Sequence, residues 1–121
     1  MQDKSCKLPE WKFVGGETQK RTFTLHELNR DRTYDIPGAY VELAVVDFVN
    51  PKSDAKLRKS IEVKSDSTGR YCEAIVNLDP ADTVNLSGKY IYQITIKDLL
   101  GNVVALRGIM HISENINKTF I

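Results

Sequence analysis

The sequence predicts an all-β fold, an immunoglobulin-like antiparallel β-sandwich of about seven strands with one short helical crossover. Apolar residues recur at every second position in several short segments, turn-forming residues separate these segments, and no segment has the sustained 3.6-residue period of a long helix. The 121 residues, 41% of them hydrophobic and 27% charged, suit one soluble globular domain. We therefore expect one hydrophobic core.

Residues 1–16 are expected to form a leader that packs partly on the core. In "LPEWKFVGGETQ", Trp11 and Phe13 can cover one end of the core, and Gly15-Gly16 supplies a flexible corner. A strand follows in "KRTFTLHEL", with Phe23 on its inward face.

The segment "IPGAYVELAVVDF" predicts a turn and then an interior strand. Pro37 and Gly38 suit the two central positions of a type II turn, because proline presets the first φ and glycine accepts the positive second one. Val41, Leu43 and Val45 then form an apolar row. The opposite row is only half polar, which indicates a strand covered on much of both faces.

The next two segments are also predicted as strands. "LRKSIEVKS" alternates as a single strand, except that Lys59 interrupts its inward row, as a position at an edge or an end would. "YCEAIVNL" is a half-buried strand with four inward residues: Cys72, Ala74, Val76 and Leu78.

A helical turn is expected in "LDPADTVNL". Asp79 can cap free backbone N–H groups, and Pro80 suits the first helical position. We expect this turn to carry the chain from one sheet to the other.

The last strands form a hairpin in "GKYIYQITIKDLLGNVVALRGIMHIS". Gly101 suits the positive φ of the hairpin loop, and Gly108 marks a bulge or a close approach of another group. The sandwich domain is assigned to residues 17–114, and residues 115–121 are a tail that either pairs with the sheet or begins a linker. The inward row on the first hairpin strand is Tyr90, Tyr92, Ile94 and Ile96.

Charge and cysteine content narrow the function classes. A formal net charge of +1 provides no bulk field to attract nucleic acid or an anionic membrane, so neither is expected as a partner. The polar start "MQDKSCKLPEW" lacks the apolar segment of a signal peptide, which favours synthesis in a cytoplasm. Cys6 and Cys72 are then two reduced thiols by default, with a disulfide between them as the alternative.

No constellation of residues predicts catalysis. His26 and His111 belong to no metal-binding spacing, and Asp79 and Asp82 are explained by capping rather than by calcium. No catalytic, cofactor-binding or metal-binding residue is therefore assigned, and the chain is not expected to be an enzyme. The candidate residues for a ligand or partner surface are four aromatic residues: Trp11, Tyr34, Tyr40 and Tyr71.

The order of these segments resembles that of a known family. A "TFTL" strand, "DIPGAYVELAVVD", a strand beginning "GRYCEAIV", the "DPADT" crossover, "SGKYIYQITIKD" and "GNVV" follow one another from about Glu17 onward. In this order they are similar to the N-terminal immunoglobulin-like domain of phage baseplate upper proteins. Members of that family usually continue into helical, fibre-forming or receptor-binding regions, whereas this sequence ends at Ile121.

The resemblance implies a non-catalytic docking domain of a bacteriophage or prophage tail. Its partners would be other tail or baseplate proteins, with a homo-oligomer as a further option. Its place would be the virion tail after synthesis in the bacterial cytoplasm. The alternative from the residues themselves is a carbohydrate-binding sandwich that uses exposed aromatic side chains as sugar platforms.

Overall fold

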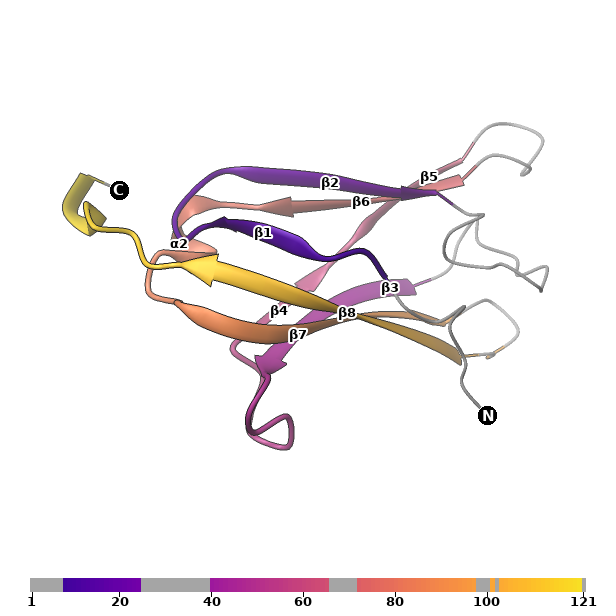
Figure 1. Ribbon diagram of the computed structural model, residues 1–121. Helices are drawn as coiled ribbons and strands as arrows, with labels where there is room; N and C mark the ends of the chain where they lie inside the picture. Colours follow the sequence, from indigo (N-terminus) through magenta and orange to yellow (C-terminus); the bar gives the residue numbers. More distant parts are fainter. Residues whose placement is uncertain (1–7, 25–39, 66–71, 98–100, 102, 121) are drawn as a thin grey trace.

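The computed structural model describes residues 8–24, 40–65, 72–97, 101 and 103–120, which form two facing β-sheets (Figure 1). The larger sheet has five strands in the order β1-β8-β7-β3-β4, and the smaller has three in the order β2-β6-β5. The prediction of an immunoglobulin-like β-sandwich is confirmed. The described residues contain eight strands rather than about seven.

The strand bounds are, in the larger sheet, β1 Trp11–Val14, β8 Val103–Ser113, β7 Gly88–Lys97, β3 Tyr40–Asp47 and β4 Leu57–Ser60, and in the smaller sheet, β2 Gln19–Thr24, β6 Cys72–Leu78 and β5 Glu62–Ser65. A short helix, α2, spans Pro80–Thr83, and a 3₁₀ turn, η2, spans Lys118–Phe120.

The core lies between the sheets and consists of the predicted inward rows. On β7 the exposed fraction falls from 7% at Tyr90 to 0% at Tyr92 and Ile94. Alternation puts every second side chain on one face, so the faces follow from the sequence once the strands are known. The other inward residues below 6% exposure include Phe23, Val41, Leu43, Val45, Ala74, Val76, Leu78, Leu106, Met110 and Ile112.

The segment expected as a leader contributes a strand to the larger sheet. Residues Trp11–Val14 pair with β8 in parallel, from Trp11 opposite Met110 to Val14 opposite Ser113, whereas the prediction was wholly antiparallel. Trp11 and Phe13 are 3% and 7% exposed, so burying these two rings fixes the face that β1 turns to the core.

The segment expected as one strand after the 48–56 loop is two strands in different sheets. Leu57–Ser60 pairs with β3, and Glu62–Ser65 pairs with β6. Ile61 stands at the switch, donates its N–H to the Val41 carbonyl at 2.8 Å and is 8% exposed. Period-two alternation continues through such a switch, so the pattern alone could not reveal it.

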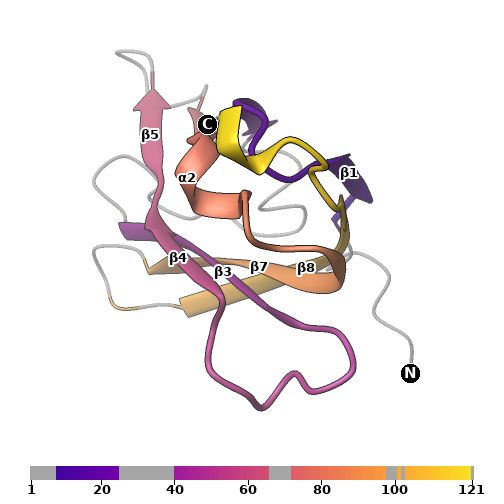
Figure 2. The ribbon, with the colours of Figure 1, turned by 90° about the vertical axis from the view of Figure 1, so that its left-hand side faces the viewer.

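Along each long side of the sandwich, one segment passes from the edge of one sheet to the edge of the other. On one side, the chain leaves β1 through Gly15 and Gly16 and enters β2; on the other side, it leaves β4 through Ile61 and enters β5 (Figure 2). All four edge strands therefore belong to two continuous stretches, 11–24 and 57–65.

The predictions for two glycines are confirmed. Gly101 has a φ of +89°, in the region that favours glycine, at the end of the β7–β8 connection. Gly108 lies opposite Tyr92 in the hairpin register, and the Tyr92 ring passes over it, which is the predicted close approach.

The predicted crossover is also confirmed. Asp79 is the N-cap of α2, Pro80 is its first residue, and the helix leads from β6 of the smaller sheet to β7 of the larger one. The Asp82 carboxylate accepts the backbone N–H of Asp79 at 2.7 Å, which satisfies a donor at the helix start.

Several sequence predictions lie outside the described residues. They are the turn at Pro37 and Gly38, the aromatic residues Tyr34 and Tyr71, His26, Cys6 and the side chain of Cys72. In the tail, the Asn115 side-chain amide donates to the Gly15 carbonyl at 2.7 Å, so the start of the tail is bound to the β1–β2 corner.

Candidate functional site

The aromatic residues chosen from the sequence do not form one surface. Tyr40 is 82% exposed at the start of β3, whereas Trp11 is 3% exposed. Trp11 is therefore not the exposed platform that was expected, although it contributes to the lining of the groove described below. Tyr34 and Tyr71 lie outside the described residues.

Trp11 is buried because it fills the space between the two sheets. Its ring packs edge-on against Tyr92, with centroids 5.5 Å apart, and is tilted against Phe13 at 5.7 Å. Its indole Nε1–H donates to the Gln19 side-chain oxygen at 3.1 Å, so β1 and β2 are bridged across the sheets. A tryptophan in the sequence predicts a large apolar contact but does not show whether the ring is buried in the core or exposed to a partner.

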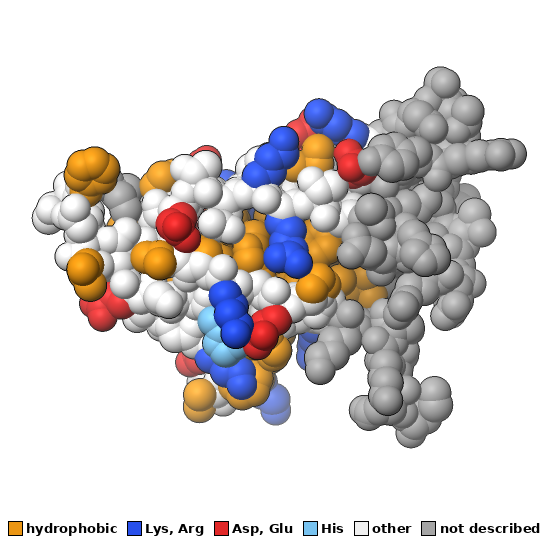
Figure 3. Space-filling view, turned by 45° about the horizontal axis from the view of Figure 1, so that its top comes forward, with side chains coloured by type: hydrophobic (Ala, Val, Ile, Leu, Met, Phe, Trp, Pro, Cys, Tyr) orange, Lys and Arg blue, Asp and Glu red, His pale blue; other side chains and the backbone are white. Residues whose placement is uncertain are grey.

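A hollow of about 370 Å³ lies between the β1 and β2 edges. We call it the β1/β2 groove. It is lined by Glu10, Trp11, Lys12, Gln19, Lys20 and Arg21. Figure 3 turns this side toward the viewer and shows basic side chains along a band of hydrophobic surface. The groove thus combines two strand edges with an excess of cationic side chains.

Arg21 lies over the aromatic part of this groove. Its guanidinium carbon is 5.6 Å from the centre of the Trp11 ring and 5.7 Å from that of Phe23. Contacts of this kind are worth about 0.5–2 kcal/mol and hold the charged group over the rings. The two rings therefore restrain the position of the Arg21 guanidinium.

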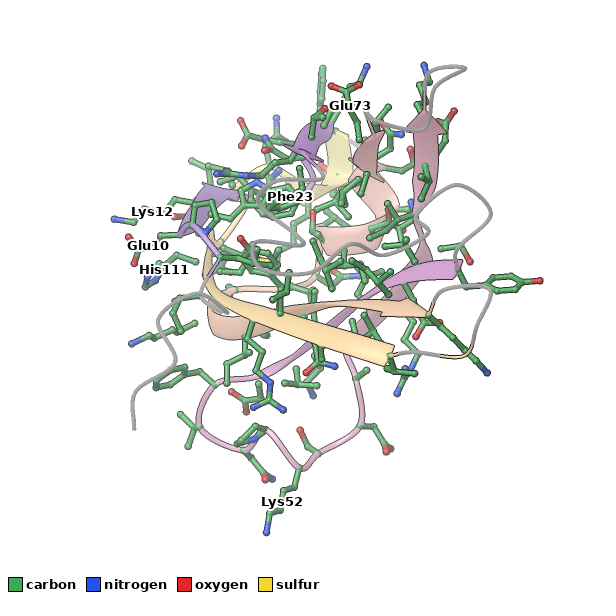
Figure 4. The ribbon with its side chains drawn as sticks, turned by 90° about the vertical axis from the view of Figure 1, so that its right-hand side faces the viewer. Glu10, Lys12, Phe23, Lys52, Glu73 and His111 are labelled. Atoms are coloured by element: carbon green, nitrogen blue, oxygen red, sulfur yellow. The ribbon has the colours of Figure 1, made fainter. Side chains whose placement is uncertain are left out.

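A charged cluster stands beside the groove, where β1 begins. Glu10 accepts a hydrogen bond from His111 Nε2 at 2.9 Å and lies 3.6 Å from Lys12 Nζ (Figure 4). The hydrogen bond from His111, with the charge of Lys12, holds the pKa of Glu10 below its ordinary value. Glu10 therefore stays ionised but is already partnered by two neighbouring groups.

The opposite side of the sandwich carries the β4–β5 edge. Because Ile61 donates to Val41, the alternation of an antiparallel pair directs the backbone groups of Arg58 and Ser60 away from β3. Outward N–H and C=O groups of this kind can pair with a strand from another chain. The β4–β5 edge is thus a second candidate contact.

Lys59 interrupts the apolar row because its amine reaches helix α2. The Nζ atom lies 2.7 Å from Asp82 Oδ2 and 3.0 Å from the Asn77 carbonyl. The hydrogen bond to Asp82 raises the pKa of Lys59 above its ordinary value despite partial burial. The sequence anomaly at Lys59 therefore marks a tie between the β4 edge and the crossover.

The outer face of the larger sheet is mainly polar and is internally paired. Arg58 lies 3.3 Å from Glu42, and Arg107 donates to the Gln93 side-chain oxygen at 2.8 Å. A hollow of about 210 Å³ lies among these residues and Pro51 of the 48–56 loop. Side chains that already bond one another offer less to a partner than the cationic groove does.

A further hollow of about 210 Å³ lies beside Tyr40. Glu42, Ser60, Thr95 and Lys97 contribute to its lining. An exposed aromatic ring beside hydroxyl, carboxylate and ammonium groups is the combination expected of a sugar platform.

Sequence reasoning missed the β1/β2 groove. Lys12 and Lys20 alternate with the buried Trp11, Phe13 and Phe23, which is a visible pattern in the sequence. That the two segments border one hollow depends on the sheet switch at Gly15-Gly16. The glycine pair predicts a corner but not that the chain passes there from one sheet to the other.

The described part of the chain contains no cluster of three or more His, Cys, Asp or Glu side chains suited to hold a metal ion. Among the same residues, no helix has the length and apolar character to cross a membrane.

In the described residues, the fold and the site together define an immunoglobulin-like β-sandwich with unpaired strand edges along two sides and a basic groove on one of them. No protein-family model and no curated protein sequence matches the chain. Among solved structures, it is similar to CopC from Methylosinus trichosporium OB3b, at 10% identity and a TM-score of 0.47, over 89% of this chain and 87% of that one.

It is also similar to AggA, the major subunit of aggregative adherence fimbriae type I from Escherichia coli. The identity is 11% and the TM-score 0.41, over 88% of this chain and 91% of that one. At such identities the likeness concerns the fold alone.

Proposed function

We propose that the chain is a non-catalytic docking domain of a bacteriophage or prophage tail (baseplate) assembly that acts through protein–protein contacts. The order of sequence motifs supports the tail assignment by resemblance. The structural observation that carries the docking function is the pair of open sides, each a continuous edge segment serving both sheets. Exposed edges can accept a strand from a partner.

The partners would be other tail or baseplate proteins, and a second copy of the chain is a further candidate. The domain would be synthesised in the bacterial cytoplasm and would end in the virion tail. Its role would be to hold neighbouring proteins in place, which requires a rigid scaffold rather than reactive groups. The packing of Trp11 on Tyr92 within the larger sheet and its hydrogen bond to Gln19 across the sheets supply such rigidity beside one open side.

The test is complex formation with tail proteins encoded beside this chain, measured by size-exclusion chromatography with light scattering. We expect a complex of defined stoichiometry that weakens when an edge is blocked. Ser60→Pro blocks the β4 edge, because this proline removes an N–H that points away from β3. Absence of any complex with these tail proteins would refute the proposal.

A carbohydrate-binding module is the second candidate, and the exposure of Tyr40 beside its hollow favours it. The test is a glycan array followed by titration of any ligand found. Saturable binding that Tyr40→Ala abolishes, with the fold unchanged by circular dichroism, would replace the docking proposal. The control is Val103→Ala, because Val103 is an exposed apolar residue. A change at another tyrosine such as Tyr90 would not serve, because Tyr90 is buried.

A further inference from the structure

We infer that the β1/β2 groove binds an extended acidic segment of a partner protein, which adds as a strand along the β2 edge. This inference rests on the docking function proposed above and names the chemistry of the partner. It depends on three features of the groove: the direction of its backbone groups, the arrangement of its charges and the length of its edge.

The backbone of β1 turns hydrogen-bonding groups toward the groove. The Gly15 N–H donates to the Ser113 carbonyl at 2.9 Å. Because bonded and unbonded residues alternate in a parallel pair, the backbone N–H and C=O groups of Lys12 and Val14 point away from β8. The Val14 N–H is taken by the Glu17 carboxylate at 2.8 Å, which closes that end. The groove is therefore open around Lys12 and closed at the β1–β2 corner.

The strand that faces β1 across the groove is β2, which has six residues and is the longest edge strand of the described residues. Among the described strands its one neighbour in the smaller sheet is β6, so every second residue of β2 directs its backbone N–H and C=O groups to the open side. At about 3.3 Å per residue, six residues offer an edge of roughly 20 Å, enough for a strand of ordinary length.

The charges of the groove favour an acidic occupant. Lys12, Lys20 and Arg21 contribute three cations, and Glu10 is the one carboxylate in the lining. Glu10 is already engaged by His111 and Lys12, so its repulsion of an incoming carboxylate is reduced.

Arg21 is the best-placed anchor for a partner carboxylate. Its guanidinium lies over Trp11 and Phe23 and keeps a planar fork of N–H donors. A fixed planar fork binds a carboxylate through two hydrogen bonds and loses little side-chain freedom in doing so. Because Lys20 and Arg21 are neighbours on β2, their side chains point to opposite faces, so an extended strand with Glu or Asp at alternate positions would meet one of these two cations from the open side.

The test uses backbone amide NMR of the ¹⁵N-labelled chain. The probe is a blocked nine-residue peptide of alternating Thr and Glu, compared with the same peptide carrying Lys in place of Glu. We expect the acidic peptide to shift amides of β1 and β2, with an affinity that falls as salt is added. The basic peptide should shift none of them.

Lys20→Glu reverses an exposed charge on the β2 edge, and Lys64→Glu makes the same change on the β5 edge of the same sheet. We expect Lys20→Glu to weaken the acidic peptide by at least about fivefold and Lys64→Glu by less than about twofold. Lys20→Gln, which adds no negative charge, should fall between them. Equal effects of the two reversals would overturn the inference.

Other outcomes would overturn it as well. These are no binding of the acidic peptide at low salt, shifts confined to β4 and β5, or tighter binding of a single-stranded oligothymidine than of the peptide. If tail proteins bind the chain but Lys20→Glu leaves them unaffected, the groove assignment fails and the docking function stands. If the acidic peptide binds the groove but no tail protein binds, the docking function fails and the groove remains a peptide site.

Discussion

The close approach of Tyr92 to Gly108 predicts that Gly108→Ala destabilises the fold. A Cβ at position 108 would lie 2.7, 2.8 and 2.9 Å from three atoms of the Tyr92 side chain, which is well inside van der Waals contact. The Tyr92 ring has no room to retreat, because it is 0% exposed and packs on Trp11 and Phe23. Its hydroxyl also donates to the Pro9 carbonyl.

Overpacking of a core typically costs about 1–3 kcal/mol, and a displaced hydroxyl would lose a hydrogen bond worth about 1 kcal/mol. Replacing a strand glycine by alanine otherwise gains up to about 1 kcal/mol through the unfolded chain. The net loss in the free energy of unfolding is therefore about 1–3 kcal/mol. At about 2.1 cal/mol/K per residue, a chain of this length loses about 4 °C of Tm per kcal/mol, or about 4–12 °C.

The assay is urea and thermal unfolding followed by circular dichroism and by the fluorescence of Trp11, which lies against Tyr92. The control is a double-mutant cycle with Tyr92→Leu, which removes the ring that the new methyl group would strike. In that background Gly108→Ala should cost less than about 0.5 kcal/mol. A Gly108→Ala protein as stable as the native chain, or an equal loss in both backgrounds, would refute this explanation of the glycine.

Gly101→Ala should lower the free energy of unfolding by about 1 kcal/mol, because φ is +89° there and alanine rarely adopts this conformation. Gly101→Asn should lower it less, and urea unfolding measures both. Lys59→Met should cost about 1 kcal/mol at neutral pH by unpairing Asp82. The pKa of Lys59 is raised in the folded protein, so the native chain should be more stable than Lys59→Met at pH values below the ordinary lysine pKa. This difference in the free energy of unfolding should disappear as pH rises through the pKa of Lys59 in the folded protein. A difference that does not change with pH would contradict this. Carboxyl NMR should show Glu10 titrating below its ordinary pKa, and His111→Ala should move the midpoint of this titration upward. The contribution of Glu10 to stability is present above its ordinary pKa and is lost as pH falls through its pKa in the folded protein.

Much of the fold could be predicted because the relevant signals are local. The alternation of Tyr90, Tyr92 and Ile94 fixes their face without knowledge of any partner strand, and the structure confirms it. The same holds for Gly101, whose φ is a property of one turn, and for the capping residue Asp79. Each of these features depends on a few adjacent residues.

The remaining features depend on pairings between distant segments. The parallel pairing of β1 with β8 joins residues about a hundred positions apart, and the switch at Ile61 leaves the alternation of its segment intact. Burial of Trp11 likewise depends on Tyr92 of the distant β7–β8 hairpin, so the sequence alone did not distinguish a platform from a core ring. The candidate site was missed for this reason, since its lining comes from two edges that only the fold brings together.

The proposed docking surface at the β1/β2 side rests on a framework that is held in place by hydrogen bonds. The groove rests on Trp11, which bonds Gln19 across the two sheets, while Tyr92 holds the Pro9 carbonyl just before β1. A partner bound there meets a surface whose side chains are already ordered, so association costs less conformational entropy than ordering a loose one, at about 0.5–1.5 kcal/mol per immobilised side chain. Tyr92→Phe, which removes the hydroxyl that donates to the Pro9 carbonyl, should therefore weaken acidic-peptide binding. Equal peptide affinity in the two proteins would contradict the role given to this anchor.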